Sequence, residues 1–162
     1  MTHDREAERF SGFMGGPIGG FLIRELNLFV RVLVPAVMRR RKLAREAKAA
    51  YRGPFRRRSS RTPMHVFPRA IIASTPFLEE VEKGLEALRE RPALLVWGDR
   101  DPVFRAGARE RWERLFSEHR TVILRGAGHF IQEEAPEEIV RAILEWRGVR
   151  SADWPLDVAP AS

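Results

Sequence analysis

The sequence predicts an α/β fold in which a helical region precedes two parallel strands and their helices. Two short, uninterrupted apolar runs carry the strand prediction: residues 93–97, between Pro92 and Gly98, and residues 121–124. Continuous apolar runs of this length are typical of strands that are buried on both faces. Each run precedes a segment with helical periodicity. The order strand, helix, strand, helix implies parallel strands joined by a right-handed crossover.

The two helices of this unit are predicted from apolar residues that recur three and four positions apart. Residues 107–117 carry such a pattern, and so do residues 136–146, which begin with a proline, a residue favoured in the first helical turn. Residues 126–132 contain two glycines and are expected to form a loop before the second helix. Residues 91–147 should therefore form one β-α-β-α unit, followed by a flexible tail at 148–162.

The preceding part of the chain is predicted to be mostly helical, after a loose, polar N-terminus at residues 1–10. From residue 10 to residue 90 the positions of Gly and Pro predict six segments: a glycine-rich loop at 10–20, an apolar helix at 21–38 that Pro35 kinks or splits, a helix at 43–51, a proline-rich loop at 52–68, a short helical or extended turn at 69–73, and a helix at 76–90 capped by Thr75. The glycine run lacks the preceding strand and the Gly-Lys-Ser/Thr ending of a phosphate-binding loop, so we do not expect one.

The composition is that of a globular protein with one hydrophobic core. Of the 162 residues, 44% are hydrophobic and 31% are charged. No apolar run reaches the roughly 18 residues that a membrane helix needs, and residues 1–10 lack the apolar core of a signal peptide. We therefore expect a cytoplasmic protein with no membrane partner. The chain has no cysteine, which excludes disulfides and thiolate metal sites, and we expect neither a metal nor another cofactor.

The net charge of +7 arises from 29 basic residues, nearly all of them arginine. Binding to nucleic acid would require this charge to gather on one face of the protein. The densest cluster, residues 39–42 with 56–58 and Arg61, has only scattered aromatic residues near it, and we interpret it as a solvated helix end and loop. We expect no nucleic-acid partner. The alternative is a non-enzymatic basic binding module, which salt-dependent binding to DNA would support.

Two ionisable residues follow the predicted strands, at the end where open parallel sheets gather their functional groups. Asp101 lies four residues after Trp97, and His129 lies five residues after Leu124. Because adjacent parallel strands place their exit loops side by side, the carboxylate and the imidazole are expected to meet. An imidazole whose Nδ1–H is bound by a carboxylate can act as a general base through Nε2.

Each of these residues also has a structural interpretation. An aspartate before a proline, such as Asp101 before Pro102, commonly caps a turn, and a histidine in a glycine-rich loop is more often structural than catalytic. Asp99 is a rival acid, but it follows Gly98 directly and suits the turn itself. The paired placement raises the catalytic interpretation to the same standing as the structural one.

Two motifs surround the pair: Pro92-Ala-Leu-Leu-Val-Trp-Gly-Asp-Arg-Asp101-Pro-Val-Phe104 and Gly126-Ala-Gly-His129-Phe-Ile-Gln-Glu-Glu-Ala-Pro136-Glu-Glu-Ile139. Together they resemble the C-terminal end of the α/β-hydrolase superfamily. The Gly-x-x-Asp turn and the Gly-His-Phe-x-Gln-Glu loop are similar to those of haloalkane dehalogenases, and epoxide and C–C bond hydrolases share them. Residues 21–67 resemble the helical cap of the same family, in Asn27-Leu-Phe29 and Ala50-Tyr-Arg-Gly-Pro-Phe55.

The resemblance implies hydrolytic cleavage of carbon–halogen bonds through an alkyl-enzyme ester, with Asp101 orienting His129 as the base. It also implies a small hydrophobic substrate, such as a halogenated alkane, beside Val103, Phe104 and Phe130. The chain departs from the family in two respects. It contains no Gly-x-Ser-x-Gly or Gly-x-Asp-x-Gly motif for a nucleophile, and residues 10–90 contain no tryptophan to bind halide.

We therefore expect the C-terminal portion of an α/β-hydrolase fold, inactive alone because its nucleophile is missing. Two strands without the remainder of their sheet would leave an exposed edge and apolar surface, so we expect self-association or dependence on a missing N-terminal half. Another α/β-hydrolase, acting on an ester or an epoxide, is the alternative. The presence of a single tyrosine in the cap-like region, Tyr51, argues mildly against epoxide hydrolases.

Overall fold

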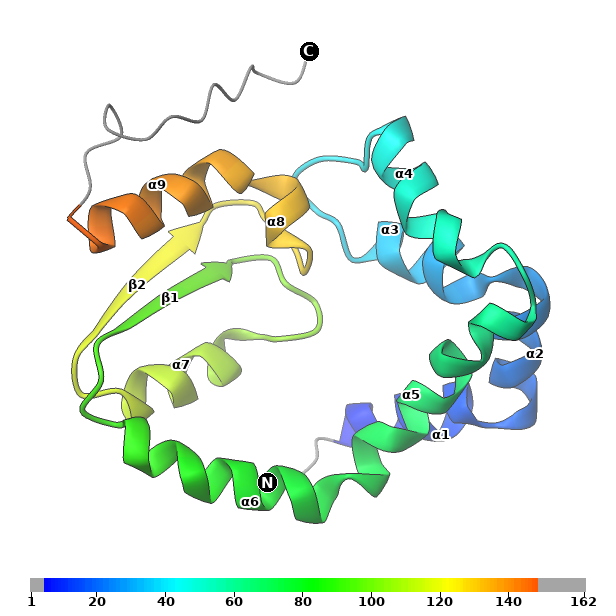
Figure 1. Ribbon diagram of the computed structural model, residues 1–162, viewed down its shortest axis with the longest axis horizontal. Coiled ribbons are helices and arrows are strands. Elements are labelled where there is room, and N and C mark those ends of the chain that lie inside the picture. Colours follow the sequence, from blue (N-terminus) through cyan, green and yellow to red (C-terminus); the bar gives the residue numbers. More distant parts are fainter. Residues whose placement is uncertain (1–4, 149–162) are drawn as a thin grey trace.

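The computed structural model describes residues 5–148, and its elements are arranged as an open ring (Figure 1). In chain order they are α1 (Arg5–Gly15), α2 (Pro17–Leu26), the π-helical turn η1 (Phe29–Leu33), α3 (Val34–Ala36), α4 (Arg45–Arg52), the 3-10 turns η2 (Gly53–Phe55) and η3 (Ser59–Arg61), α5 (Thr62–Ala73), α6 (Thr75–Leu85), the 3-10 turn η4 (Glu86–Leu88), β1 (Ala93–Gly98), α7 (Ala106–Leu115), β2 (His119–Leu124), α8 (Ile131–Glu134) and α9 (Pro136–Trp146). Most of the predicted tail and part of the predicted loose start lie outside the described residues.

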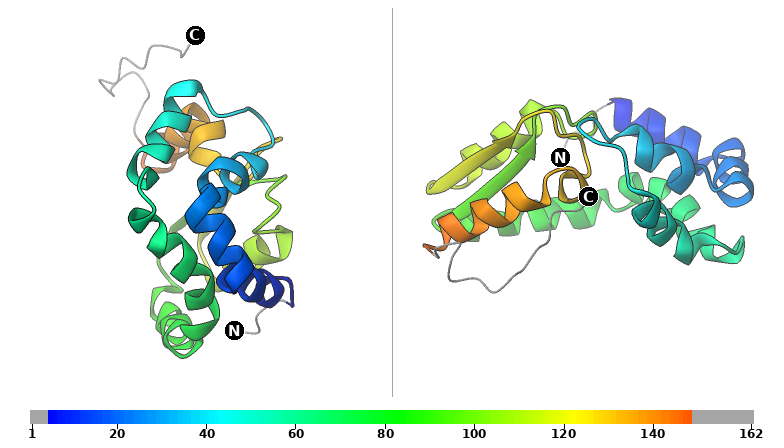
Figure 2. Two further views of the ribbon diagram at one scale, coloured as in Figure 1. Left: turned by 90° about the vertical axis from the view of Figure 1, so that its right-hand side faces the viewer. Right: turned by 90° about the horizontal axis from the view of Figure 1, so that it is seen from above.

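The predicted β-α-β-α unit is confirmed. Strands β1 and β2 pair in parallel, with Ala93 opposite His119 and Gly98 opposite Leu124. Seen from above, the sheet lies between α7 and α9 (Figure 2). The expectation that both strands are buried on both faces is wrong, because only Gly98 and Leu124 at their ends are buried. In residues 5–148 no further strand pairs with β1, and its other edge has no neighbour in the sheet.

Two small hydrophobic clusters hold the fold together on either side of the loop after β2. Val34, Met38 and Leu43 form the first, with Phe130 packed against it. A second cluster consists of Leu124, Ala127 and Ala135, with Ile131 packed against it. Phe130 and Ile131 are consecutive residues. The loop that carries His129 is therefore anchored in the helical region on one side and in the sheet on the other.

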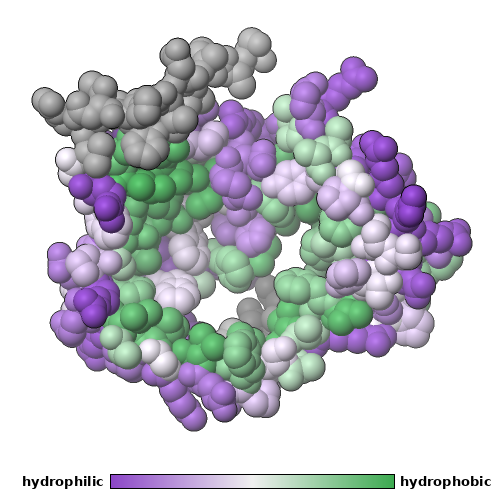
Figure 3. Space-filling view, in the orientation of Figure 1, coloured by the Kyte–Doolittle hydropathy of each residue, from purple (hydrophilic) through white to green (hydrophobic). Residues whose placement is uncertain are grey.

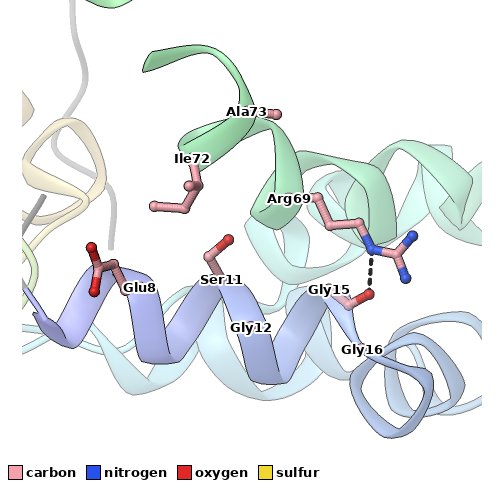
Figure 4. Close-up of a pocket in the computed structure, with 8 residues that line it drawn as sticks. All are labelled: Glu8, Ser11, Gly12, Gly15, Gly16, Arg69, Ile72 and Ala73. Carbon is pink, nitrogen blue, oxygen red and sulfur yellow. Dashed lines mark hydrogen bonds between the residues drawn. The ribbon is translucent and has the colours of Figure 1, made fainter.

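The prediction of a glycine-rich loop at residues 10–20 is wrong, because this segment forms α1 and the start of α2. Its small residues instead allow close helix packing between α1 and α5 (Figure 4). Arg69 of α5 crosses over Gly15 and donates a hydrogen bond from Nε to its carbonyl. Nearby, the buried Ser11 hydroxyl donates to the carbonyl of Pro68 at 2.6 Å. Glycine content alone does not distinguish a loop from a helix that has small residues on one face.

The helix predicted at residues 21–38, with a kink at Pro35, is interrupted earlier in the chain. The break falls at Asn27, which caps α2 in the left-handed conformation with φ 53°. Pro35 lies in α3, which continues directly from the π-helical turn η1, and both a proline and a π-helical turn are common causes of helix kinks. The helix predicted at residues 76–90 ends earlier, with α6 followed by a 3-10 turn, and its cap residue is Ser74 rather than Thr75.

The prediction of a loop at residues 52–68 is also wrong, since two 3-10 turns and most of α5 occupy this stretch. A long-range contact orders it. The Arg61 guanidinium donates to the carbonyls of Arg24 at 2.6 Å and Glu25 at 3.1 Å, at the end of α2, and to that of Phe55 at 2.9 Å. An ion pair between Arg58 and Glu25 joins the same two segments. The prolines in this stretch thus lie at the start of helical turns or, in the case of Pro68, inside a helix.

Viewed as a space-filling surface, the molecule has an opening at its centre, with apolar side chains along much of its rim (Figure 3). β1 is the strand nearer this opening in Figure 1. Many large apolar residues are exposed, among them Phe13, Phe21, Phe67, Phe77 and Phe104. None of the helices in residues 5–148 combines the length and apolarity needed to cross a bilayer.

Gly12 and Gly19 provide a matched test of the packing near the N-terminus. A Cβ on exposed Gly12 meets no atom within 4 Å, whereas one on buried Gly19 would overlap the backbone of Phe13 and Met14. Because alanine favours a helix over glycine by about 1 kcal/mol, Gly12→Ala should raise the melting temperature by about 2–4 °C. Gly19→Ala should lower it. Thermal melts followed by far-ultraviolet circular dichroism compare the two, and stabilisation by both variants would contradict the packing.

Candidate active site

Asp101 lies in the turn after β1, and that turn is built around its carboxylate. Oδ1 accepts the N–H groups of Val103 at 2.7 Å and Phe104 at 3.0 Å. The indole N–H of Trp97, near the end of β1, donates to the carbonyl of Phe104 at 2.9 Å and closes the turn. These contacts match the turn-capping interpretation of Asp101. They also fix the carboxylate so that Oδ2 is presented to a second partner.

That second partner is His129. Its Nδ1 lies 3.0 Å from Oδ2 and 3.2 Å from Oδ1 of Asp101. The Asp101 side chain is 8% exposed and the His129 side chain is 27% exposed. Because a carboxylate can only accept, this contact favours the neutral tautomer that carries its hydrogen on Nδ1 and its lone pair on Nε2. Throughout residues 5–148 the ring's hydrogen bonds go to Asp101 alone, so Nε2 is available as a base.

Three glycines bring the two loops close enough for this contact. A Cβ on Gly98, at the end of β1, would overlap the main chain of Ala127 and Gly128, and a Cβ on Gly128 would overlap the carbonyl oxygen of Val37. Gly126 has φ 78°, in the left-handed region that other residues avoid. The loop after β2 therefore lies directly against the end of β1 and against the segment after α3.

Aromatic rings enclose the imidazole on two sides. The centroid of the Phe104 ring lies 5.2 Å from that of His129, and Phe130 packs edge-on against His129 at 5.4 Å. Tyr51 of α4 packs edge-on against Phe130 at 5.9 Å. Of the three residues predicted to line a pocket, Phe104 and Phe130 thus lie beside His129. Val103 is held at the turn by its main chain, and its side chain is exposed.

The rival acid, Asp99, makes structural contacts between the turn after β1 and the loop after β2. Its Oδ1 accepts the N–H of Gly126 at 2.6 Å, and its Oδ2 lies 3.6 Å from Arg125. It therefore links the two loops without contacting the imidazole. Among the described residues, no group of three or more His, Asp or Glu side chains is arranged to hold a metal ion.

Two residues near the pair were not singled out as site residues by the sequence. Glu134 is buried and lies behind the His129 loop, and nothing in the run Gln-Glu-Glu distinguishes it from its two more exposed neighbours. Tyr51 donates a hydrogen bond to Glu133 Oε1 at 3.1 Å. Burial raises the pKa of the Tyr51 phenol above its usual 10.0, the Glu133 carboxylate raises it further, and a hydrogen bond with Gln132 partly opposes these effects.

The family profile of the alpha/beta hydrolase fold matches residues 2–136. The chain therefore belongs to the α/β-hydrolase fold family, as the two motifs predicted. Among curated proteins, haloalkane dehalogenase 2 of Mycobacterium tuberculosis is 35% identical over 138 residues, which cover 84% of this chain and 48% of the relative. The haloalkane dehalogenase of Bradyrhizobium diazoefficiens is 33% identical over 135 residues, covering 79% of this chain and 43% of the relative.

Solved structures agree with these relatives. A crystal structure of an ancestral haloalkane dehalogenase is similar with a TM-score of 0.76 at 31% identity, over 90% of this chain and 53% of the other. Haloalkane dehalogenase DbeA from Bradyrhizobium elkani is similar with a TM-score of 0.75 at 29% identity, over 91% and 52%. This member of the α/β-hydrolase fold family is thus similar to haloalkane dehalogenases, and it spans about half the length of the relatives that it matches.

Asp101→Asn separates the two uses of the Asp101 carboxylate. Asparagine keeps an oxygen for the N–H groups of Val103 and Phe104, but it can turn an NH₂ group toward His129. The imidazole should then change from the Nδ1–H to the Nε2–H form. Folding should weaken by only about 1–2 kcal/mol. Nitrogen-15 NMR of the imidazole measures the tautomer, and an unchanged tautomer would show that Asp101 does not orient the ring.

Tyr51 is the only tyrosine in the chain, so the absorbance of tyrosinate reports on it alone. Because its folded-state pKa is raised above 10.0, its titration in the native protein should occur at higher pH than in denaturant. The stability contributed by the neutral phenol is full below pH 10.0 and is lost as pH rises through the folded-state pKa. Glu133→Gln should lower the native pKa, since it removes the nearby negative charge. Equal native and denatured titrations would contradict the raised pKa of the half-buried phenol.

Proposed function

We propose that Asp101 and His129 are the acid and the base of a haloalkane dehalogenase-type catalytic triad, which hydrolyses the carbon–halogen bond of a small apolar substrate. One observation carries this proposal: at the ends of two adjacent parallel strands, the carboxylate lies 3.0 Å from Nδ1 and leaves Nε2 available. The relatives that share this part of the fold are named haloalkane dehalogenases, which favours this branch of the family.

The proposed reaction has two steps. In the first, a carboxylate nucleophile attacks the carbon that bears the halogen, the carbon–halogen bond breaks, and halide leaves with the electron pair. An alkyl ester of the enzyme results. In the second step, Nε2 of His129 takes a proton from water, and the hydroxide attacks the ester carbonyl. The ester bond breaks, the alcohol departs, and the proton passes from the imidazolium to solvent, so the sum is haloalkane plus water to alcohol, halide and a proton.

Asp101 acts only in the second step. Its negative charge, fixed by two main-chain N–H groups, stabilises the imidazolium that forms when Nε2 accepts a proton. Phe104 and Phe130 are proposed to form an apolar wall beside His129, together with Val103 once a substrate is bound. Such a wall suits a halogenated alkane, which offers no groups for hydrogen bonding. The earlier expectations of no nucleic-acid partner and of a cytoplasmic location stay predictions.

The nucleophile is proposed to come from polypeptide that corresponds to the half of the relatives that this chain does not span. In residues 5–148 the edge of β1 opposite β2 has no partner strand. Apolar side chains rim the central opening (Figure 3), and large apolar residues such as Phe21 and Phe77 are exposed. An unpaired edge and an extensive apolar surface favour association with further protein. Self-association of the chain is the competing outcome.

A complementation experiment tests this function directly. The unmatched half of the Mycobacterium tuberculosis relative is produced and combined with this chain, and bromide release from 1-bromobutane is followed. Release should require both parts. With His129→Ala, the second step should fail, so that one bromide per site is released and the butyl ester accumulates, visible as added mass on the partner half. Steady-state turnover should fall by about 10²–10⁴-fold, the range for loss of a general base.

His119→Ala is the matched control, because His119 is exposed at the start of β2, far from Asp101 along the strand. It should leave turnover unchanged. Undiminished steady-state release by His129→Ala would remove His129 from the mechanism. Hydrolysis of an ester or an epoxide without bromide release would assign the chain to another branch of the family. Dimers of this chain alone that exclude the added half would favour self-association.

A further inference from the structure

A nearly fully buried carboxylate lies behind the loop that carries His129. Glu134, at the end of α8, is 3% exposed. Its Oε1 accepts the main-chain N–H groups of Arg39 at 2.5 Å and Arg40 at 2.7 Å, and its Oε2 accepts the N–H of Gly128. Burying a carboxylate is costly unless hydrogen bonds replace its water. Here three N–H groups do so, and together with Glu134 they form what we call the Glu134 clamp.

The donors of the clamp come from segments far apart in the chain. Gly128 directly precedes His129, whereas Arg39 and Arg40 belong to the connection between α3 and α4 in the helical region. A fourth hydrogen bond runs between the same segments in the opposite direction, from the N–H of His129 to the carbonyl of Val37 at 3.1 Å. The main chain leading into His129 is therefore tied to the helical region twice, directly through the N–H of His129 and, through Glu134, by the N–H of Gly128.

We propose that Glu134 is a positioning residue for His129, holding the imidazole toward Asp101 by fixing loop 126–130 against segment 37–40. This role rests on the proposed function, in which His129 is the base. In residues 5–148 the hydrogen bonds of the Glu134 side chain go to main-chain N–H groups and not to the imidazole or to Asp101, so it acts through the main chain of Gly128. Once that main chain is fixed, only the two side-chain torsions of His129 are left, and the neighbouring rings of Phe104 and Phe130 limit them.

A carboxylate suits this position better than any neutral group. All three partners are donors, and an ionised carboxylate offers acceptors only. In Glu134→Gln, one oxygen becomes an NH₂ group that must face at least one of the three N–H donors. The variant keeps the size of the side chain and loses at least one bond of the clamp. Glu133→Gln is the matched control, because Glu133 is the adjacent residue, is only partly buried and accepts from Tyr51 instead.

The test uses this chain alone and does not depend on halide chemistry. Nitrogen-15 NMR of the imidazole and exchange of its Nδ1 proton with water are measured in the unaltered protein, Glu134→Gln and Glu133→Gln. In Glu134→Gln the Nδ1 proton should exchange about tenfold faster, the factor expected for the net loss of one hydrogen bond, and both tautomers should appear. Glu133→Gln should resemble the unaltered protein, and Glu134→Asp, which restores a carboxylate, should recover part of the signal.

An unchanged imidazole signal in Glu134→Gln, with or without a lower melting temperature, would overturn the proposal and leave Glu134 a purely structural residue. If Glu134→Gln does not fold, amide exchange in the unaltered protein decides. The N–H groups of Arg39, Arg40 and Gly128 should be protected, and exchange as fast as in exposed loops would refute the clamp.

The complemented enzyme adds a kinetic test. Glu134→Gln should leave the first release of bromide unchanged and slow the hydrolysis of the ester, since only the second step uses His129. Equal slowing of both steps would point to general destabilisation and overturn positioning. Should bromide never be released by any form, the proposed function fails, while the NMR result on Glu134 is unaffected.

Discussion

Six residue pairs in parallel register hold β1 beside β2, from Ala93 opposite His119 to Gly98 opposite Leu124. The candidate site depends on where this register ends. Both strands stop at the same level, so the turn after β1 and the loop after β2 start side by side. Gly98 and Gly128 have no side chains to separate the two, and their main chains come into contact. A shift of the register would separate Asp101 from His129, because neither side chain is long enough to compensate.

The Asp101 carboxylate contacts its own turn and the imidazole at the same time. Oδ1 closes the turn over Val103 and Phe104, while Oδ2 makes the shorter contact with the imidazole. The structural and the catalytic interpretations of this residue are therefore compatible. The turn fixes the carboxylate before any substrate is bound, which is what an orienting acid requires. His129 is held in a similar way, with its loop anchored between two hydrophobic clusters through Phe130 and Ile131.

Local pattern was sufficient for the β-α-β-α unit and for the contact between Asp101 and His129. The apolar runs at residues 93–97 and 121–124 have few alternatives to strands, since both are short and bounded by turn residues. The helix at Pro136–Trp146 has a proline at its start and apolar residues at helical spacing, and its bounds match the prediction. Chain order then placed Asp101 and His129 at neighbouring strand ends. Each of these inferences depends on a short stretch of sequence and on the general geometry of parallel sheets.

The helical region and the support of the site were decided by contacts between distant segments. Gly15 and Ser11 indicated a loop. They instead lie on a helix face of small residues, against which Arg69 and Pro68 of α5 pack. Residues 52–61 lie against the end of α2 because the Arg61 guanidinium binds the carbonyl oxygens of Arg24 and Glu25.

The sequence by itself determined the α/β class, the order of the strands and the pair that they bring together, since those follow from local periodicity. Only the tertiary structure decided which of two adjacent glutamates is buried. Glu133 faces Tyr51, whereas Glu134 faces three main-chain N–H groups. Two of those N–H groups lie more than ninety residues away along the chain, and hydrogen bonds over such separations depend on the completed packing rather than on any local sequence signal.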